Sequence, residues 1–227
     1  MHMMEQYPVF TAQELRVLRS VSGGSSLRGF FPERVPRRQE ILAATAALMR
    51  RGLLTSGPDG AFEPVPGTAA EMIRPMIDPE LVVYVTPMAE EEPQVAFAFG
   101  KDGAVGYESV LVQEGAVRLF PMHEDGWLDQ LRNRGLLPEE EIPEARRKVA
   151  AESVDFDTAP EQLEQMWNRG VAYLEFHRRG GIERKVYLRD GAGDVQAVVM
   201  TPTGSLSTND SALAVRLRDW QMEETTK

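Results

Sequence analysis

The sequence contains no cysteine among its 227 residues, which excludes disulfide bonds and thiolate metal sites. It has only three histidines, His2, His123 and His177, and none stands at metal-ligand spacing from another histidine or a carboxylate. No apolar run reaches the roughly 18 residues that a membrane-spanning helix requires. The opening stretch MHMMEQYPVF lacks a basic segment followed by an apolar one, so we expect no signal peptide and a cytoplasmic location.

The motifs of the well-known catalytic sites are also missing. There is no Gly-x-Ser-x-Gly and no Gly-x-Gly-x-x-Gly between a strand and a helix, and SGGSS at 22–26 is not followed by Gly-Lys-Ser/Thr. The acidic triplets at 90–92 and 139–141 lie beside prolines, where neighbouring loop acids share one environment, whereas catalytic carboxylates need different ones. We therefore expect no enzymatic activity, no catalytic residue, no metal and no cofactor.

Positive charge is scarce, and it is concentrated in one segment. The formal net charge is −10, which repels nucleic acid and anionic membranes. Between residues 28 and 51, however, six arginines stand against two glutamates, a local charge of +4. A helix here, followed by the turn TSGPDG, is also typical of a winged-helix transcriptional regulator, so DNA binding through residues 37–65 is the alternative function. The helix centre ILAATAALM and the acidic turn do not favour it.

Helix starts are marked by three capping boxes, in which a threonine precedes a glutamate by three residues. They begin at Thr11, Thr68 and Thr158. Apolar residues at helical spacing add three further helices, and the second helix has Ile41, Leu42, Leu48 and Met49 at that spacing. The predicted helices cover about 12–21, 37–51, 69–77, 125–134, 159–169 and 209–221.

Strands are indicated where the apolar period changes to two. Glycine-bearing joints as short as EG and GKDG separate several of these runs, which is typical of antiparallel meanders. The predicted strands cover 81–87, 95–99, 104–113, 116–120, 171–177, 182–188 and 194–201. The fold class that follows is α+β, with antiparallel sheet meanders and flanking helices.

The order of a capped helix, three strands and a helix occurs twice. Strand starts at 95, 105 and 116 return at 171, 182 and 194, offsets of 76, 77 and 78 residues. We therefore expect two quasi-two-fold related α/β halves, 1–136 and 154–227, joined by a charged linker at 137–153. The phrase RGLL, at 51–54 and 134–137, is out of register with this repeat, so we interpret it as a shared way of ending a helix.

Several phrases in this order resemble the EspG family of type VII secretion chaperones. They are TAQELRVLRSV, LMRRGLL, AFEPVPGTAAEMIRPMIDPELVVYV, the meander containing AVRLF, and VAYLEFHRRGGIERKVYLRDGAGDVQAVVMTPTGSL before the last helix. The resemblance implies a quasi-two-fold α+β fold around an antiparallel sheet. It also implies a cytosolic binding protein that keeps the tip of a helical-hairpin substrate, a secreted protein or heterodimer, soluble until export.

A partner-binding surface is expected on the strands, because few helices are available to cover both faces of the sheets. Phe97, Phe99, Tyr107 and Tyr187 are the candidates for its apolar centre, as large residues on meander strands. Arg184 and Lys185 are the candidates for its charged rim, because they interrupt a β-rich run. The alternative for the phenylalanines is a buried pair. Alternation also places Tyr173 and Glu175 on one face of their strand.

Overall fold

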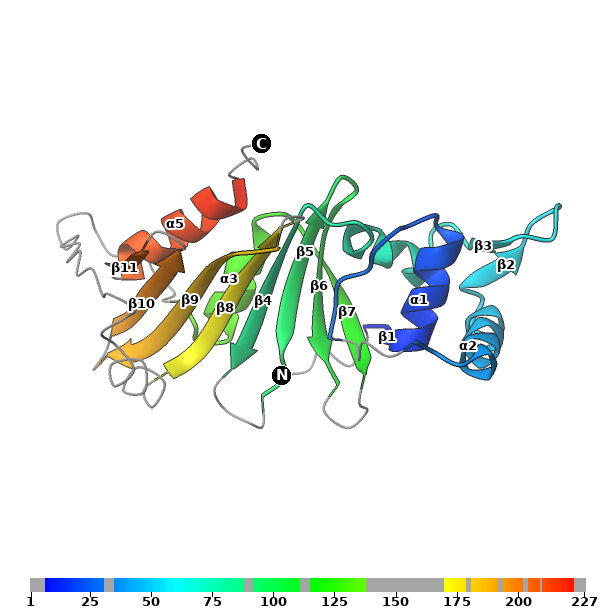
Figure 1. Cartoon of the computed structure of the whole chain (residues 1–227), viewed down its shortest axis with the longest axis horizontal. Coiled ribbons are helices and arrows are strands. Elements are labelled where there is room, and N and C mark those ends of the chain that lie inside the picture. Colours follow the sequence, from blue (N-terminus) through cyan, green and yellow to red (C-terminus); the bar gives the residue numbers. More distant parts are fainter. Residues whose placement is uncertain are drawn as a thin grey trace. The chain divides into compact units, whose positions relative to one another are not determined.

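The chain folds into two units, each built on antiparallel strands, in the computed structural model (Figure 1). The first unit comprises Met1–Glu80 and Val95–Glu124, and the second comprises Leu81–Gln94 and Asp125–Lys227. No described helix is long and apolar enough to cross a membrane. The structure describes residues 7–30, 35–87, 92–110, 115–137, 170–178, 181–191, 194–201, 204–208 and 210–222, with the backbone alone at 170–171 and from 181 to 216 except Ala214.

The first unit contains an antiparallel sheet in the strand order β1-β7-β6-β5. The strands are β1 (Val9–Thr11), β5 (Val95–Gly100), β6 (Gly103–Ser109) and β7 (Ala116–Met122). The last three are the predicted meander. The sequence does not indicate β1, because a strand of three residues is too short to show an alternating pattern.

Helix α1 (Ala12–Val21) begins with the predicted capping box. The Glu14 amide donates to the Thr11 hydroxyl at 3.2 Å, and the Thr11 amide donates to the Glu14 carboxylate at 2.8 Å. The buried face of the helix includes Leu15 and Leu18, which are fully enclosed. This helix start is therefore set by local sequence, and its packing by the spacing of the apolar side chains.

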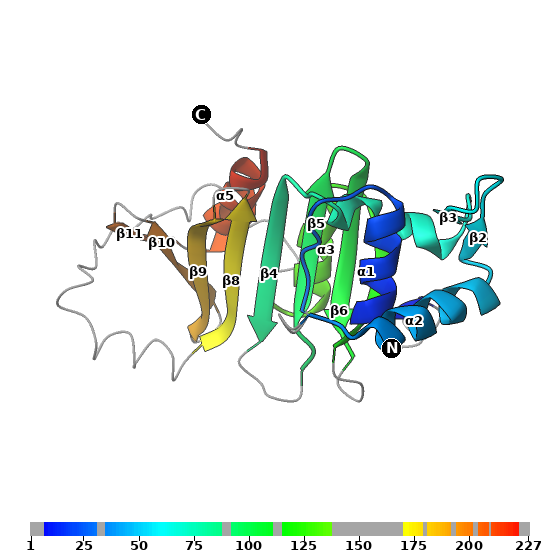
Figure 2. The ribbon, with the colours of Figure 1, turned by 45° about the vertical axis from the view of Figure 1, so that its right-hand side comes forward.

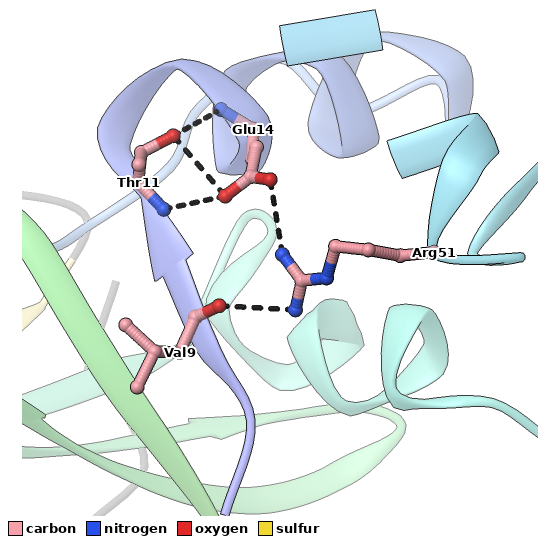
Figure 3. Close-up of polar contacts among 4 residues, drawn as sticks. All are labelled: Val9, Thr11, Glu14 and Arg51. Carbon is pink, nitrogen blue, oxygen red and sulfur yellow. Dashed lines mark hydrogen bonds and ion pairs between the residues drawn. The ribbon is translucent and has the colours of Figure 1, made fainter. Parts of the chain in front are cut away.

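Glu14 also connects α1 to the end of α2 (Arg38–Arg50), as Figure 3 shows. Arg51 donates to the Glu14 carboxylate at 2.9 Å and to the Val9 carbonyl oxygen at 3.0 Å. Its guanidinium carbon lies 4.9 Å from the centre of the Phe10 ring. One arginine of the basic segment is thus used to hold the first unit together.

The two RGLL phrases form the same helix ending. After α2, the Gly52 amide donates to the Met49 carbonyl and the Leu53 amide to the Leu48 carbonyl. After α3 (Gly126–Asn133), the amides of Gly135 and Leu136 donate to carbonyls at the same offsets, three and five residues back. The glycine φ angles of 67° and 70° are left-handed, which glycine adopts without strain, and the leucines that follow are buried. The shared helix-stop interpretation is confirmed.

The segment after this ending differs in part from the prediction. Strands β2 (Leu54–Ser56) and β3 (Phe62–Pro64) form a hairpin, and η2 (Ala69–Met76) is a 3₁₀ helix rather than an α-helix. Its capping box is altered, because Glu71 accepts from the Gly67 amide at 2.9 Å instead of the Thr68 amide. Pro75 lies inside the helix and has no amide hydrogen to donate.

Asp78 attaches the end of this segment to the SGGSS loop. Its carboxylate accepts from the amides and hydroxyls of Ser25 and Ser26, at distances from 2.7 to 2.9 Å. The Ser25 hydroxyl, followed by the Ser25 amide and the Ser26 hydroxyl, holds the pKa of Asp78 well below its ordinary value of 3.8. The glycine- and serine-rich loop is therefore held by a carboxylate of the same unit.

The second unit contains a sheet in the order β4-β8-β9-β10-β11, antiparallel at every described pair. Its strands are β4 (Leu81–Pro87), β8 (Gly170–Arg178), β9 (Gly181–Gly191), β10 (Asp194–Thr201) and β11 (Gly204–Thr208). Its helices are α3 (Gly126–Asn133) and α5 (Asp210–Met222). All of these elements except β11 were predicted, and the α+β class with antiparallel sheets and flanking helices is confirmed.

The units do not coincide with the predicted halves 1–136 and 154–227. Strand β4 belongs with the second unit because it pairs with β8 over its whole length. Helix α3 does so because Trp127 donates to the Gln221 side chain of α5 at 2.7 Å. Apart from Leu137, the predicted linker 137–153 lies outside the described residues, as does the predicted helix 159–169. The two-fold relation between the halves stays a prediction.

Candidate partner-binding face

Three of the expected partner-binding residues are buried in the first unit. Phe97 and Tyr107 are 0% exposed and Phe99 is 8% exposed. The Tyr107 ring lies 5.5 Å from that of Phe30, and the Phe97 ring lies 6.4 Å from that of Phe120. The expectation that these side chains remain on an open sheet face is therefore wrong.

Their burial has a cause that the sequence does not reveal directly. Phe97 and Phe120 are both directly opposite Gly106, which has no side chain, so the Phe120 ring lies over the glycine backbone. A Cβ atom on Gly106 would come within 2.0 Å of that ring. On the other face, the Tyr107 hydroxyl donates to the Arg28 carbonyl at 3.1 Å, because the chain from 27 to 30 crosses that side of the sheet.

The other three expected residues lie on β9 of the second unit, where the backbone is described. Lys185 is paired with Glu175 of β8, and Tyr187 is paired with Tyr173. Arg184 is paired with Phe176 instead. Since paired residues share a face of an antiparallel sheet, Lys185 and Tyr187 are placed on one face of the sheet and Arg184 on the other.

The two faces of β8 differ in the kind of residue and in burial. Residues Ala172, Leu174, Phe176 and Arg178 are buried, and Phe176 lies between Trp127 of α3 and Trp220 of α5, with ring centres 6.3 and 5.8 Å away. Arg178 donates to the carbonyl oxygen of Trp220 at 2.7 Å. Helices α3 and α5 therefore cover this face of β8.

The opposite face carries a half-buried group that we call the β4–β8 face: Tyr84, Thr86, Tyr173, Glu175 and His177. The Tyr173 hydroxyl donates to one oxygen of Glu175, and His177 Nε2 lies 2.9 Å from the other. The Tyr84 ring packs edge-on against His177, with ring centres 4.8 Å apart. One carboxylate thus orients a tyrosine and a histidine on a partly accessible sheet surface.

This arrangement is suited to recognition by shape and hydrogen bonding. Glu175 and His177 are 22% and 18% exposed at their side chains, and the two tyrosines add flat rings with polar ends. Among the described residues, no group of three or more potential ligands could hold a metal ion.

The alternation of VAYLEFH predicts that Tyr173 and Glu175 share a face, which is confirmed. Tyr84 and His177 were missed, because their proximity depends on the pairing of β4 with β8.

The alternative DNA-binding surface, residues 37–65, consists of α2 and the β2–β3 hairpin. Leu42 and Met49, both at the predicted apolar spacing of α2, are 58% and 43% exposed, whereas Ala44 and Leu48 are its buried residues. The hairpin exposes Asp59 and Glu63. Apolar side chains on the helix and acids on the hairpin do not fit a duplex, so we do not propose this function.

Comparisons with known proteins bear on the fold. No protein-family model matches the sequence, and no curated protein matches it. The structure is similar to a solved chain from the complex described as the Mycobacterium tuberculosis type VII secretion system chaperone EspG5 with the PE25–PPE41 dimer. The match has a TM-score of 0.54 and 11% sequence identity, and it covers 91% of this chain and 92% of the other. The resemblance predicted from the sequence is thus confirmed for the fold, and the chain has the α+β fold of the chaperone EspG5.

Proposed function

We propose that the protein is a cytoplasmic binding protein of the EspG chaperone type. It holds the end of a helical-hairpin substrate, a secreted protein or heterodimer, against the β4–β8 face and keeps it soluble until type VII export. It uses no cofactor and catalyses no reaction. The fold shared with EspG5, a chaperone whose solved complex contains a PE25–PPE41 dimer, supports this proposal.

The observation that carries the proposal is the difference between the two faces of β8. Large apolar residues on one face are enclosed by α3 and α5, with Phe176 only 1% exposed. On the other face Tyr84 and Tyr173 remain partly accessible beside two ionisable side chains. Partly exposed tyrosines on a rigid strand lose little conformational entropy on binding, which makes them effective anchors for a partner helix.

The chemistry of this face indicates how a partner is held. Tyr84 and Tyr173 supply an aromatic centre, Glu175 an acceptor already oriented by two neighbours, and Lys185 and Tyr187 extend the same face onto β9. An apolar centre with a polar rim is the usual organisation of a protein interface. Phe97, Phe99, Tyr107 and Arg184 are not used in this proposal.

The proposal is tested by co-expression with candidate substrates. The chain is purified from its own cells under native conditions, and the proteins that accompany it are identified by mass spectrometry. Each is then produced in a heterologous host with and without the chain. We expect at least one helical, exported protein that is insoluble alone and soluble as a complex.

A matched pair of variants locates the effect. Tyr173→Ala removes an anchor from the β4–β8 face, whereas Arg132→Ala removes a half-buried side chain of α3 whose contact with the exposed Asp129 is a surface ion pair. We expect lost solubilisation with the first variant and none with the second, both at an unchanged melting temperature. Equal solubilisation by both variants would place the interface elsewhere. Slower migration of duplex DNA through a gel in the presence of the wild-type chain would favour the winged-helix alternative.

A further inference from the structure

Helix α2 has an uncovered side in the first unit, apart from the β4–β8 face of the second unit. Of its thirteen residues, only Ala44 and Leu48 are buried. Leu42 and Met49 are 58% and 43% exposed, and Val35, just before the helix, is 88% exposed. Figure 2 shows α2 beside α1, whose contacts with α2 account for the buried side.

The exposed side chains of α2 form a stripe along the helix. Leu42 and Met49 are seven residues apart, which is close to two full turns, and Ala46 lies between them on the same side. The small side chain of Ala46 lets another backbone approach closely. We call Leu42, Ala46 and Met49 the α2 stripe, and it is about 10 Å long.

Positive charge borders the stripe at both ends. Arg38 precedes Leu42 by four residues and Arg50 follows Met49, and helical geometry places them on opposite sides of the stripe. Both are exposed, and among the described residues neither forms an ion pair. The chain as a whole has a charge of −10, so this basic border is complementary to acids from outside the chain rather than typical of its surface.

Charge decides which occupant fits. A two-fold contact with a second copy would bring Arg38 and Arg50 against the same arginines, which costs free energy. A DNA groove would meet Leu42 and Met49, which offer base edges no hydrogen-bond donor and no acceptor beyond a weak thioether. A helix with an apolar seam and acidic flanks covers the stripe and pairs both arginines.

We propose that α2 is a second docking surface, which takes an acidic amphipathic helix of a partner protein along Leu42, Ala46 and Met49, with Arg38 and Arg50 pairing its carboxylates. This surface is separate from the β4–β8 face and does not depend on the proposed chaperone function. It gives the chain two binding surfaces, one in each unit.

The test uses designed peptides and the absence of cysteine from the chain. The probe is an acidic peptide of about three heptads with leucine at the seam and glutamate at the flanks, which also limits its self-pairing. A control peptide has lysine in place of glutamate. An environment-sensitive dye is attached at Gln39→Cys, an exposed position of α2 beside the stripe, or at Asn133→Cys on the exposed side of α3 as the control position.

We expect the acidic peptide to change the dye signal at Gln39→Cys, with a Kd below about 1 mM, and to leave the signal at Asn133→Cys unchanged. Leu42→Ser with Met49→Ser should weaken binding at least about tenfold. Arg38→Glu with Arg50→Glu should exchange the preference, so that the lysine peptide binds and the acidic one does not; this variant alters only exposed charges and keeps the test valid if the serine variant fails to fold.

Four results would overturn the proposal: no signal from the acidic peptide, equal binding of both peptides, unchanged preference after charge reversal, or a signal that depends only on protein concentration or added duplex DNA. The second result would show that the helix binds peptides non-specifically, and the fourth would show that it self-associates or binds nucleic acid.

Discussion

Replacing Phe97 by alanine should destabilise the first unit without involving any partner. The side chain is 0% exposed, and its ring meets that of Phe120 at 6.4 Å across Gly106. A fully buried phenylalanine cut to alanine costs about 3–5 kcal/mol, from lost burial and from the cavity that remains. Since glycine offers no side chain to fill that cavity, we expect a loss in the upper half of this range.

Urea denaturation of wild type and Phe97→Ala, followed by tryptophan fluorescence and by circular dichroism, measures this loss. Both probes are needed, because Trp127 and Trp220 lie in the second unit, whereas Phe97 lies in the first. Phe97→Leu, which retains most of the apolar volume, should cost less than about 1.5 kcal/mol. A loss below about 1 kcal/mol for Phe97→Ala would refute the burial of this ring and restore it as a candidate for an exposed anchor.

Three further substitutions test local features of the first unit. Gly106→Ala should lower the free energy of unfolding by about 1–3 kcal/mol, because the added Cβ atom forces the Phe120 ring to move. An unchanged midpoint of urea denaturation would contradict this packing. Arg51→Met should lower the free energy of unfolding by about 1–2 kcal/mol, a figure reduced for solvent screening because the Arg51 side chain is 37% exposed. Because the two residues form an ion pair, Glu14→Gln should cost less in the Arg51→Met protein than it does in the wild type. Asp78→Asn should lower the melting temperature at neutral pH. Because folding depresses the pKa of Asp78, the ionised carboxylate stabilises the protein above about pH 4, and this stabilisation is lost as the pH falls further. The melting temperatures of wild type and Asp78→Asn should therefore converge as the pH falls. A difference that stays constant with pH would contradict this role of Asp78.

Much of the fold follows from local sequence signals. The capping box at Thr11 and Glu14 and the two glycine endings depend on residues only a few positions apart, so the sequence predicts them correctly. Short apolar runs separated by glycine-bearing joints also place the strands of both meanders, although β5 is buried on both faces and β8 mainly on one. The 3₁₀ helix η2 departs from the predicted α-helix over Ala69–Met76, and Pro75 within it has no amide hydrogen to donate.

The candidate site could be predicted only in part, because it depends on contacts between distant segments. Phe97 and Tyr107 look like exposed strand aromatics until the ring of Phe120 and the chain at 27–30 are placed over the two faces of the sheet. Tyr84 and His177 are 93 residues apart (177 − 84) and meet through β-pairing alone. Leu42 and Met49 follow helical spacing, but the spacing does not show whether another element covers them.

The central claim is that the β4–β8 face binds the exported partner, and the affinity of Tyr173→Ala for that partner tests it most directly. A soluble peptide that spans the hairpin end of the partner found by co-purification is titrated against wild type, Tyr173→Ala and Arg132→Ala by isothermal calorimetry, with melting temperatures measured in parallel. We predict a Kd at least about tenfold weaker for Tyr173→Ala and unchanged for Arg132→Ala, as expected for loss of an interface anchor. Equal affinities for all three proteins, with Tyr173→Ala fully folded, would contradict the account.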